Sequence, residues 1–417
     1  MTTKQTFVIV GAGLAGAKAA EALRTEGFDG RVILLGEEGD RPYDRPPLSK
    51  DYLQGKSEKD KIYIHPEEFY ADHDIDLRLD TRVASIDRSS HEVTLEGGER
   101  ISYHKLLLVT GSSPRRLAVP GNDLDGVLYL RRLEDCEALK AAFKTAKRVA
   151  IIGAGWIGLE TAAAARAAGC EVTVLEQGEL PLLAVLGREV AEIYAGVHRD
   201  HGVQLRLGVD VAEITGKDGR ATGVRLEDSG VVESDTIVVG VGITPNTELG
   251  EAAGLTIDSG VVVDQYLTTS DADIFAAGDV ANAYYPLFDT HLRLEHWSAA
   301  LNQGPVAAAN MVGRVVSYDH VPYFFSDQYD VGMEYSGFVS GGHYDEVIFR
   351  GDVAKREFIA FWIESGRVRA GMNVNVWDVT DTIQRLVRSG QVVDRAKLAD
   401  PAVPLGEALG GALAEAD

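Results

Sequence analysis

The chain contains little cysteine and no long apolar segment, and both absences limit what it can be. Only Cys136 and Cys170 occur in 417 residues, without a C-x-x-C motif or a Cys/His cluster. A disulfide framework is therefore excluded, and no metal or iron–sulfur site is expected. Apolar runs such as 238–241 are short and broken by glycine, so none could span a bilayer. The first residues lack the features of a signal peptide, and we expect a cytoplasmic protein.

Positive charge is also scarce. The sequence has 41 Lys and Arg against 64 Asp and Glu, a formal net charge of −23. This balance argues against a nucleic-acid partner, because neutralising phosphates requires a basic surface. It also disfavours an anionic membrane surface. The composition is otherwise that of a globular protein, and the length favours two or three domains.

A glycine phrase, VIVGAGLAG, lies at residues 8–16 between an apolar strand and an alanine-rich helix. Gly11 would permit a tight turn, Gly13 would let a pyrophosphate approach the backbone, and Gly16 would let the helix pack on the strand. The helix N-terminus would face the phosphates, and Glu37, after the next strand, would accept hydrogen bonds from a ribose. The phrase therefore predicts a dinucleotide site. The predicted elements are strands 7–10 and 31–35 and helix 17–25.

The phrase recurs as AIIGAGWIG at residues 150–158, with Gly153, Gly155 and Gly158 in the same places. Glu176 follows 18 residues after Gly158, and a carboxylate at the ribose would repel a 2′-phosphate. The next three residues supply no cation, so NADH is favoured over NADPH. The predicted elements here are strands 148–152, 171–175, 203–207 and 236–241 and helix 159–168.

The residues after the second glycine phrase differ in composition and pattern from those before it. A break is expected at 242–246, then a short strand within DIFAAGD (273–279) and a helix over 299–312. From about Tyr323 aromatic residues cluster and strands alternate with Gly and Asp turns, which is typical of a small α+β unit with antiparallel strands. The residues from Pro404 are expected to be helical and then frayed.

Further motifs occur in a characteristic order: RPPLSKDYL (45–53), Thr-Gly (110–111), YLRRLED (129–135), GVGITPN (240–246), TSDADIFAAGD (269–279) and FFSDQYD (324–330). With the two glycine phrases, they make the chain resemble the flavoprotein pyridine-nucleotide reductases of glutathione reductase type. More narrowly, it resembles the NADH-dependent ferredoxin reductases of the putidaredoxin reductase type, which serve bacterial cytochrome P450 and ring-hydroxylating dioxygenase systems. The likeness covers essentially the whole chain.

The resemblance implies an α/β fold with two Rossmann-like dinucleotide-binding domains and a small α+β C-terminal domain. The FAD domain would comprise residues 1–113 and 245–322, the NADH domain 114–244 and the C-terminal domain 323–417. FAD would bind without a covalent bond, because no His or Cys lies in an attachment motif. We expect a monomer or weak dimer.

Residue roles also follow from the resemblance. Lys50 would lie beside the flavin ring, Glu160 would point at the nicotinamide and pair with Lys50, and both are the candidate catalytic residues. Asp279 would close the FAD site, and Trp297 would contact the flavin just before a helix whose N-terminus faces its N1–O2 edge. The full set of expected cofactor-binding residues is Gly11, Gly13, Leu14, Ala15, Gly16, Glu37, Arg45, Lys50, Val83, Thr110, Gly111, Arg131, Gly278, Asp279, Trp297, Gly153, Gly155, Trp156, Ile157, Gly158, Glu160, Glu176, Gly242 and Ile243.

The missing thiols decide the expected chemistry. Disulfide reductases of this superfamily carry a redox-active cysteine pair, and peroxidase and oxidase relatives carry a single cysteine, but residues 45–53 contain no sulfur. Cys136 and Cys170 are expected to be structural. Electrons would then pass from FAD directly to an external acceptor, and an iron–sulfur ferredoxin suits single-electron transfer.

Two alternatives stay open. The chain could be an NADH-dependent flavoprotein that reduces a quinone or a rubredoxin. It could also be an NADH-responsive interaction protein like apoptosis-inducing factor. For ferredoxin docking on so acidic a chain, a local basic patch would be needed, and Arg293 and Arg314 are candidates.

Overall fold

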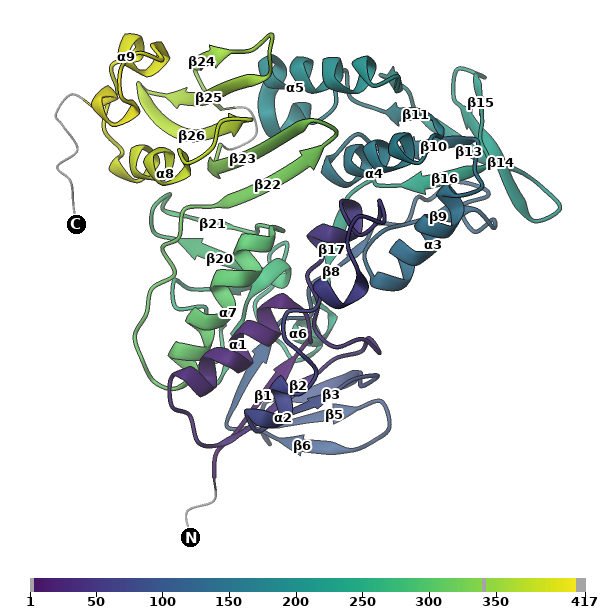
Figure 1. The fold of residues 1–417 in the computed structure, drawn as a ribbon. Helices are drawn as coiled ribbons and strands as arrows, with labels where there is room; N and C mark the ends of the chain where they lie inside the picture. The colour runs from purple at the N-terminus through teal and green to yellow at the C-terminus, as the bar shows by residue number, and fades with distance from the viewer. Residues whose placement is uncertain (1–3, 340–342, 410–417) are drawn as a thin grey trace. The chain divides into compact units, whose positions relative to one another are not determined.

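The computed structural model describes residues 4–339 and 343–409, which form a mixed α/β structure (Figure 1). The chain divides into two compact units. Unit 1 contains the chain up to Arg45, Glu58–Ser113 and Ile243–His320. Unit 2 contains Pro46–Ser57, Pro114–Gly242 and the chain from Val321. The segment Pro46–Ser57, expected within the first domain, thus groups with unit 2, and the three-domain division stays a prediction.

Unit 1 is built on a five-stranded parallel sheet in the order β19-β7-β1-β2-β3. Its central strands are apolar and buried, as expected for a parallel sheet covered on both faces. The strands are β1 (Thr6–Val10), β2 (Arg31–Leu35), β3 (Ile75–Arg78), β7 (Lys105–Leu108) and β19 (Ile274–Ala276).

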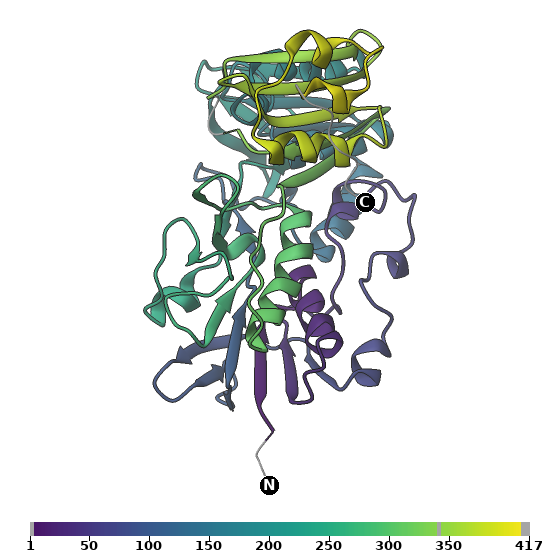
Figure 2. The same ribbon diagram turned by 90° about the vertical axis from the view of Figure 1, so that its left-hand side faces the viewer.

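Two helices of unit 1 run side by side, α1 (Leu14–Thr25) and α7 (Trp297–Met311) (Figure 2). Gly304 makes this close packing possible, because a Cβ there would lie 2.4 Å from the carbonyl oxygen of Ala15. The other helical segments of unit 1 are Lys59–Lys61, α2 (Phe69–Asp72), α6 (Glu248–Ala252) and Gly278–Val280. The other strands are β4 (Val83–Asp87), β5 (Glu92–Leu95), β6 (Arg100–Ser102), β17 (Ile243–Pro245), β18 (Val261–Val263), β20 (Ala281–Tyr285) and β21 (Thr290–Leu292), and β8 (Ser112–Pro114) ends where the chain passes into unit 2.

Unit 2 repeats the parallel design in the order β12-β11-β10-β16-β9. The strands are β9 (Val127–Leu128), β10 (Arg148–Ile152), β11 (Glu171–Glu176), β12 (Gln204–Leu207) and β16 (Thr236–Val239). The accompanying elements are a 3-10 turn at Pro46–Ser49, α3 (Leu133–Phe143), α4 (Trp156–Ala167), α5 (Leu183–Asp200) and the antiparallel strands β13 (Val211–Lys217), β14 (Arg220–Leu226) and β15 (Val231–Glu233).

The C-terminal part of unit 2 is an antiparallel sheet in the order β22-β23-β26-β25-β24, which confirms the predicted antiparallel strands. Its core is aromatic, with Phe358, Phe361 and Trp362 fully buried. The elements are β22 (Tyr323–Gln328), β23 (Val331–Gly337), β24 (Glu346–Asp352), β25 (Glu357–Glu364), β26 (Arg367–Val374), α8 (Thr380–Ser389), α9 (Arg395–Ala399) and a 3-10 turn at Leu405–Ala408.

The predicted α/β fold class is confirmed, and several details differ. Helices α1 and α4 begin at Leu14 and Trp156, three residues earlier than predicted, because the glycine phrases themselves form the first helical turn. The expected break at 242–246 contains the short strand β17. Of the expected C-terminal helix, the structure has the turn at 405–408, and residues 410–417 lie outside the described ones. Within the described ranges, no helix is long and apolar enough to cross a membrane.

Candidate functional site

The first glycine turn (residues 11–16) joins β1 to α1. Gly11 has φ +119°, and a Cβ there would lie 2.1 Å from the carbonyl oxygen of Val109. A Cβ at Gly16 would lie 2.1 Å from the carbonyl oxygen of Gly11. At Gly13, by contrast, a Cβ would meet none of the described residues within 4 Å. Gly11 and Gly16 are thus required by the fold, whereas Gly13 leaves open space at the start of α1.

The second glycine turn (residues 153–158) joins β10 to α4 with the same geometry. Gly153 has φ +100°, with the carbonyl oxygen of Gly240 2.3 Å from a Cβ position. A Cβ at Gly158 would lie 2.1 Å from the carbonyl oxygen of Gly153, while Gly155 again has no described atom within 4 Å. In both turns the helix N-cap is a glycine and the first turn holds no acidic residue. Free N–H groups beside an open approach fit the pyrophosphate of a dinucleotide in each unit.

The acids after the two turns are held differently. Glu176, at the end of β11, accepts hydrogen bonds from the N–H groups of Ala154 (2.7 Å) and Gly178 (2.8 Å). Glu37 lies on the surface, with its side chain 45% exposed and a carboxylate oxygen 3.7 Å from Nε of Arg82. Glu176 is therefore fixed beside its glycine turn, which suits a residue that selects the nucleotide.

Asp279 lies in the 3-10 turn Gly278–Val280 of unit 1, far along the chain from the first glycine turn. It is buried and accepts a hydrogen bond of 2.7 Å from the hydroxyl of Ser112. The N–H of Gly278, which has φ +72°, donates to Oε1 of Gln303 (2.8 Å). Ser112 and Gln303 were not among the expected residues, because nothing in the sequence indicates that 167 or 25 positions of separation would be bridged.

Trp297 is the first residue of α7, two residues earlier than the predicted helix start. Its indole Nε1 donates a hydrogen bond of 2.8 Å to Asp44, a residue that the sequence analysis missed. Burial raises the pKa of the Asp44 carboxyl, and the bond from Trp297 opposes that rise. Arg45 forms an ion pair of 2.7 Å with Glu38 in the same unit.

Other expected cofactor residues lie at element boundaries. The hydroxyl of Thr110 donates to the carbonyl of Asn246 (2.7 Å), and Gly111 has φ +68°. The N–H of Arg131 donates to Asp135 (2.9 Å) just before α3. The remaining positions are Leu14 and Ala15 in the first turn of α1, buried Val83 at the start of β4, Trp156 and half-exposed Ile157 in the first turn of α4, Gly242 with φ +101° and Ile243 at the start of β17.

Lys50 and Glu160 form the expected ion pair. Nζ of Lys50 lies 2.8 Å from Oε1 of Glu160, and the side chains are 11% and 3% exposed. Glu160 also accepts hydrogen bonds from the hydroxyls of Ser49 and Ser326, the second at 2.7 Å. Nζ of Lys50 stands 5.4 Å from the ring centre of Phe325. A charge pair this deeply buried requires such compensating donors, and the two serines supply them.

Both cysteines are buried, as expected for structural residues. Burial raises the pKa of Cys136 to about 12 and also raises the pKa of Cys170, so neither thiol is a ready nucleophile. The thiol of Cys170 donates weakly to the carbonyls of Phe143 and Ala146. Neither cysteine forms a disulfide in this structure.

The two candidate docking cations are each neutralised by a carboxylate. Arg293 pairs with Glu295, and Arg314 pairs with Glu26. Because each arginine is paired with a carboxylate, neither pair adds net positive charge to a docking surface. The described residues do not bring three or more metal-ligating side chains together, and the expectation of no metal site stays a prediction.

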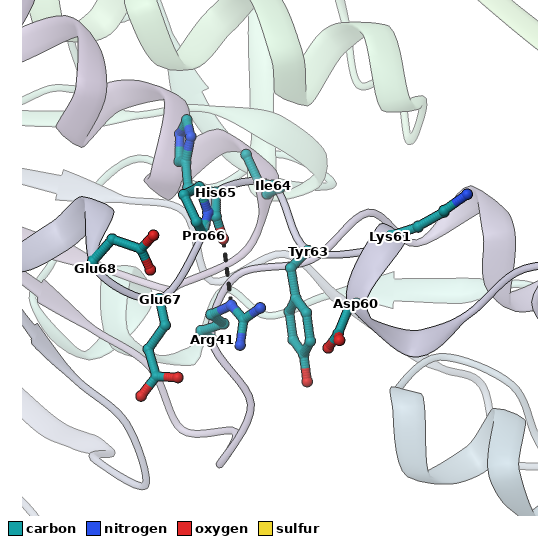
Figure 3. A pocket seen from close by; sticks show the side chains of 9 residues that line it. All are labelled: Arg41, Asp60, Lys61, Tyr63, Ile64, His65, Pro66, Glu67 and Glu68. Carbon is teal, nitrogen blue, oxygen red and sulfur yellow. Dashed lines mark hydrogen bonds between the residues drawn. The ribbon is translucent and has the colours of Figure 1, made fainter.

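A hollow of about 780 Å³ in unit 1 contains none of the expected site residues (Figure 3). Among its lining residues, Arg41 stacks 3.5 Å from the ring centre of Tyr63 and donates to the carbonyl of His65 (3.3 Å). The Tyr63 hydroxyl donates to Asp40 (2.7 Å). The glycine turns and the buried Lys50–Glu160 pair therefore remain the candidate site. The hollow is lined by Arg41, Asp60, Lys61, Tyr63, Ile64, His65, Pro66, Glu67 and Glu68.

Comparison with known proteins agrees with this geometry. Residues 5–304 match the pyridine nucleotide-disulphide oxidoreductase family, and residues 323–409 match the reductase C-terminal family. The chain belongs to the pyridine nucleotide-disulphide oxidoreductase family.

The proteins similar to this chain include reductases, and the similarity covers most of their length. The chain is 40% identical to a probable ferredoxin reductase, CtmF, of Castellaniella defragrans, covering 97% of this chain and 98% of that protein. It is 37% identical to a rubredoxin-NAD(+) reductase of Pseudomonas putida, covering 82% of this chain and 88% of the relative. Among solved structures, the covalent putidaredoxin reductase–putidaredoxin complex matches with a TM-score of 0.94 at 35% identity, covering 99% of both chains.

Proposed function

We propose that this protein is an NADH-dependent ferredoxin reductase of an oxygenase system. FAD binds without a covalent bond to the first glycine turn in unit 1, and NADH binds to the second glycine turn in unit 2. The observation that carries the proposal is the duplicated turn, in which Gly13 and Gly155, unlike the glycines on either side of them, leave room for a pyrophosphate. The ferredoxin reductases among its relatives support the choice of acceptor.

The electron balance explains why a flavin is needed. NADH gives up a hydride, which carries two electrons, whereas a [2Fe–2S] ferredoxin accepts one. Bound FAD supplies this conversion, so that each NADH reduces two ferredoxins and releases one proton. No thiol step is required, which agrees with the buried, protonated cysteines.

The chain's own residues have distinct tasks in this proposal. The N-terminus of α1 and Asp279 hold FAD, and the N-terminus of α4 holds the NADH pyrophosphate. Glu176 accepts hydrogen bonds from the NADH ribose and repels a 2′-phosphate. Lys50 supplies the positive charge that favours hydride acceptance, and its ion pair with Glu160 holds that charge in place.

Rubredoxin is the second candidate acceptor, because a rubredoxin reductase is among the relatives. A quinone acceptor and an NADH-responsive interaction protein remain as alternatives from the sequence analysis. The proposed compartment is the cytoplasm, in keeping with two unpaired cysteines.

The test is anaerobic mixing of the purified yellow protein with NADH, followed by steady-state turnover with several [2Fe–2S] ferredoxins and a rubredoxin, using cytochrome c as the reporter. We expect rapid flavin bleaching and faster turnover with at least one ferredoxin than with rubredoxin or quinone. A long-lived NADH–flavin complex with negligible turnover would instead support the interaction protein. Flavin that remains on the polypeptide after acid precipitation would refute non-covalent binding.

A further inference from the structure

Glu160 is the end point of a chain of buried hydrogen bonds in unit 2. Beyond Lys50 and Ser49, its carboxylate accepts from the hydroxyl of Ser326 on β22 (2.7 Å). The Ser326 oxygen is in turn 3.1 Å from Nε2 of Gln328, two residues along the same strand. Oε1 of Gln328 lies 2.8 Å from Nε2 of His198 on α5.

This series of hydrogen bonds ends at Tyr329. Its hydroxyl lies 3.2 Å from Nδ1 of His198, and its ring stacks on His201 with 3.9 Å between centroids. Ser326, Gln328 and His198 are each at most 1% exposed. A buried polar group without a partner is costly, so each of these side chains depends on its neighbours for its hydrogen bonds.

The direction of every hydrogen bond in this series is fixed. An ionised carboxylate only accepts, so Ser326 must donate to Glu160 and must itself accept from the Gln328 amide N–H. The Gln328 carbonyl oxygen then accepts from the Nε2–H of His198. This leaves Nδ1 of His198 as the acceptor for the Tyr329 hydroxyl.

That tautomer requires a neutral imidazole. Burial lowers the pKa of His198 to about 4; the hydrogen bond with Gln328 opposes this shift, and the nearby His201 adds to it. The imidazole is therefore neutral at pH 7, and all four donors point toward Glu160. Chains of aligned donors polarise one another, which strengthens the last bond to the carboxylate.

We propose that Ser326, Gln328 and His198 are positioning residues that hold the Glu160 carboxylate against Lys50. None of them needs to touch either cofactor. The inference deepens the proposed function and rests on it, since the pair's task is to favour hydride acceptance.

The decisive experiment is a double-mutant cycle on the holoenzyme with Ser326→Ala, Lys50→Met and both changes together. The rate of flavin reduction by NADH is measured under anaerobic conditions. Ser326→Ala should slow reduction about tenfold when Lys50 is present, as expected for one lost hydrogen bond to a charged group. In the Lys50→Met background, it should change the rate less than about twofold, because the pair no longer exists.

Ser336→Ala is the matched control. Ser336 is also buried, lies on the adjacent strand β23, and its hydroxyl accepts from Gln384 (3.3 Å) without touching Glu160. Its replacement should leave the rate unchanged. Gln328→Leu, which keeps the Ser326 hydroxyl, provides a second variant if Ser326→Ala does not fold.

A readout that does not depend on activity is the tautomer of His198, read from its ¹⁵N chemical shifts. The proposal requires a neutral ring protonated at Nε2. A ring protonated at Nδ1, an unchanged rate in Ser326→Ala, or equal slowing in both Lys50 backgrounds would overturn it. If the wild-type flavin is not reduced by NADH, the proposed function fails, and the tautomer alone then decides whether the network exists.

Discussion

The two glycine turns have nearly the same backbone, but the helices that follow them carry side chains of opposite charge at the equivalent position. Two residues after the third glycine, unit 1 has Lys18 and unit 2 has Glu160. Lys18 is partly exposed and pairs with Glu21 on its own helix (2.8 Å). Glu160 is 3% exposed and receives donors from three other positions. In the proposed function, the turn fixes where a dinucleotide binds, and the side chain two residues later determines whether the turn also contributes a residue to hydride transfer.

The largest expected effect separates glycines that the fold requires from those that a ligand requires. Gly153→Ala should lower the free energy of unfolding by about 3 kcal/mol, because it combines a positive φ with a backbone clash. Gly11→Ala should do the same in unit 1. Chemical denaturation of the purified variants measures both.

Gly155→Ala is the control for this pair. A Cβ there meets no described atom within 4 Å, and the backbone is extended with φ −78°. The variant should keep its stability and its FAD, while its Kd for NADH should rise about tenfold, or ~1.4 kcal/mol. Equal loss of stability at Gly153 and Gly155 would show that the fold itself requires Gly155, and not only a bound nucleotide.

Acid should destabilise both units through one buried histidine in each. Burial lowers the pKa of His198 in unit 2 and of His296 in unit 1 to about 4. The unfolded chain therefore binds protons between pH 6.5 and 4 that the native state does not, so stability falls as the pH is lowered through this window. Each histidine should cost about 2 kcal/mol at pH 5 relative to pH 7.5.

The pH dependence of denaturation, measured for the wild type and for His198→Gln and His296→Gln, tests this expectation. Each variant should lose about half of the decline between pH 7.5 and pH 5. A variant with the full wild-type decline would show that its histidine is protonated in the native state.

Glu176, the acid after the second turn, predicts a preference for NADH over NADPH. Replacing Glu176 and Gln177 together by arginine should shift the ratio of kcat/KM toward NADPH about tenfold, ~1.4 kcal/mol. The gain is limited because Glu176 also accepts the N–H groups of Ala154 and Gly178, and Gln177 contacts Asp210. Glu171→Arg, at the exposed start of the same strand β11, is the control and should not change the preference. Unaltered NADH preference in the double variant would place Glu176 away from the ribose.

Much of this architecture could be predicted from local sequence. Strands 31–35 and 148–152 have the predicted bounds, because short apolar runs bounded by glycine leave little choice in a parallel sheet. The Lys50–Glu160 pair followed from the family resemblance. The helix starts were predicted three residues late, since glycine is a poor helix former and its role in the first turn is visible only in the backbone.

The partners of the site residues could not be predicted. Ser326 is 166 positions from Glu160, and Asp44 is 253 positions from Trp297, and both are ordinary polar residues in the sequence. Ser49 lies within the RPPLSKDYL motif, yet its position beside Lys50 did not indicate a bond to the same carboxylate. Such contacts arise from tertiary packing, and no local pattern of hydrophobicity or spacing encodes them.

The most direct test of the account is electron transfer without thiols. Cys136→Ser and Cys170→Ser in one variant should leave NADH-dependent ferredoxin reduction within about twofold of the wild-type rate. Some stability should be lost, on the order of 1–3 kcal/mol, because serine is more polar and both sites are buried. Anaerobic stopped-flow reduction by NADH followed by ferredoxin turnover gives both rates, with Lys50→Met as the variant expected to be slow. A double-serine variant that folds and binds FAD but no longer reduces ferredoxin would contradict direct transfer and require a thiol step.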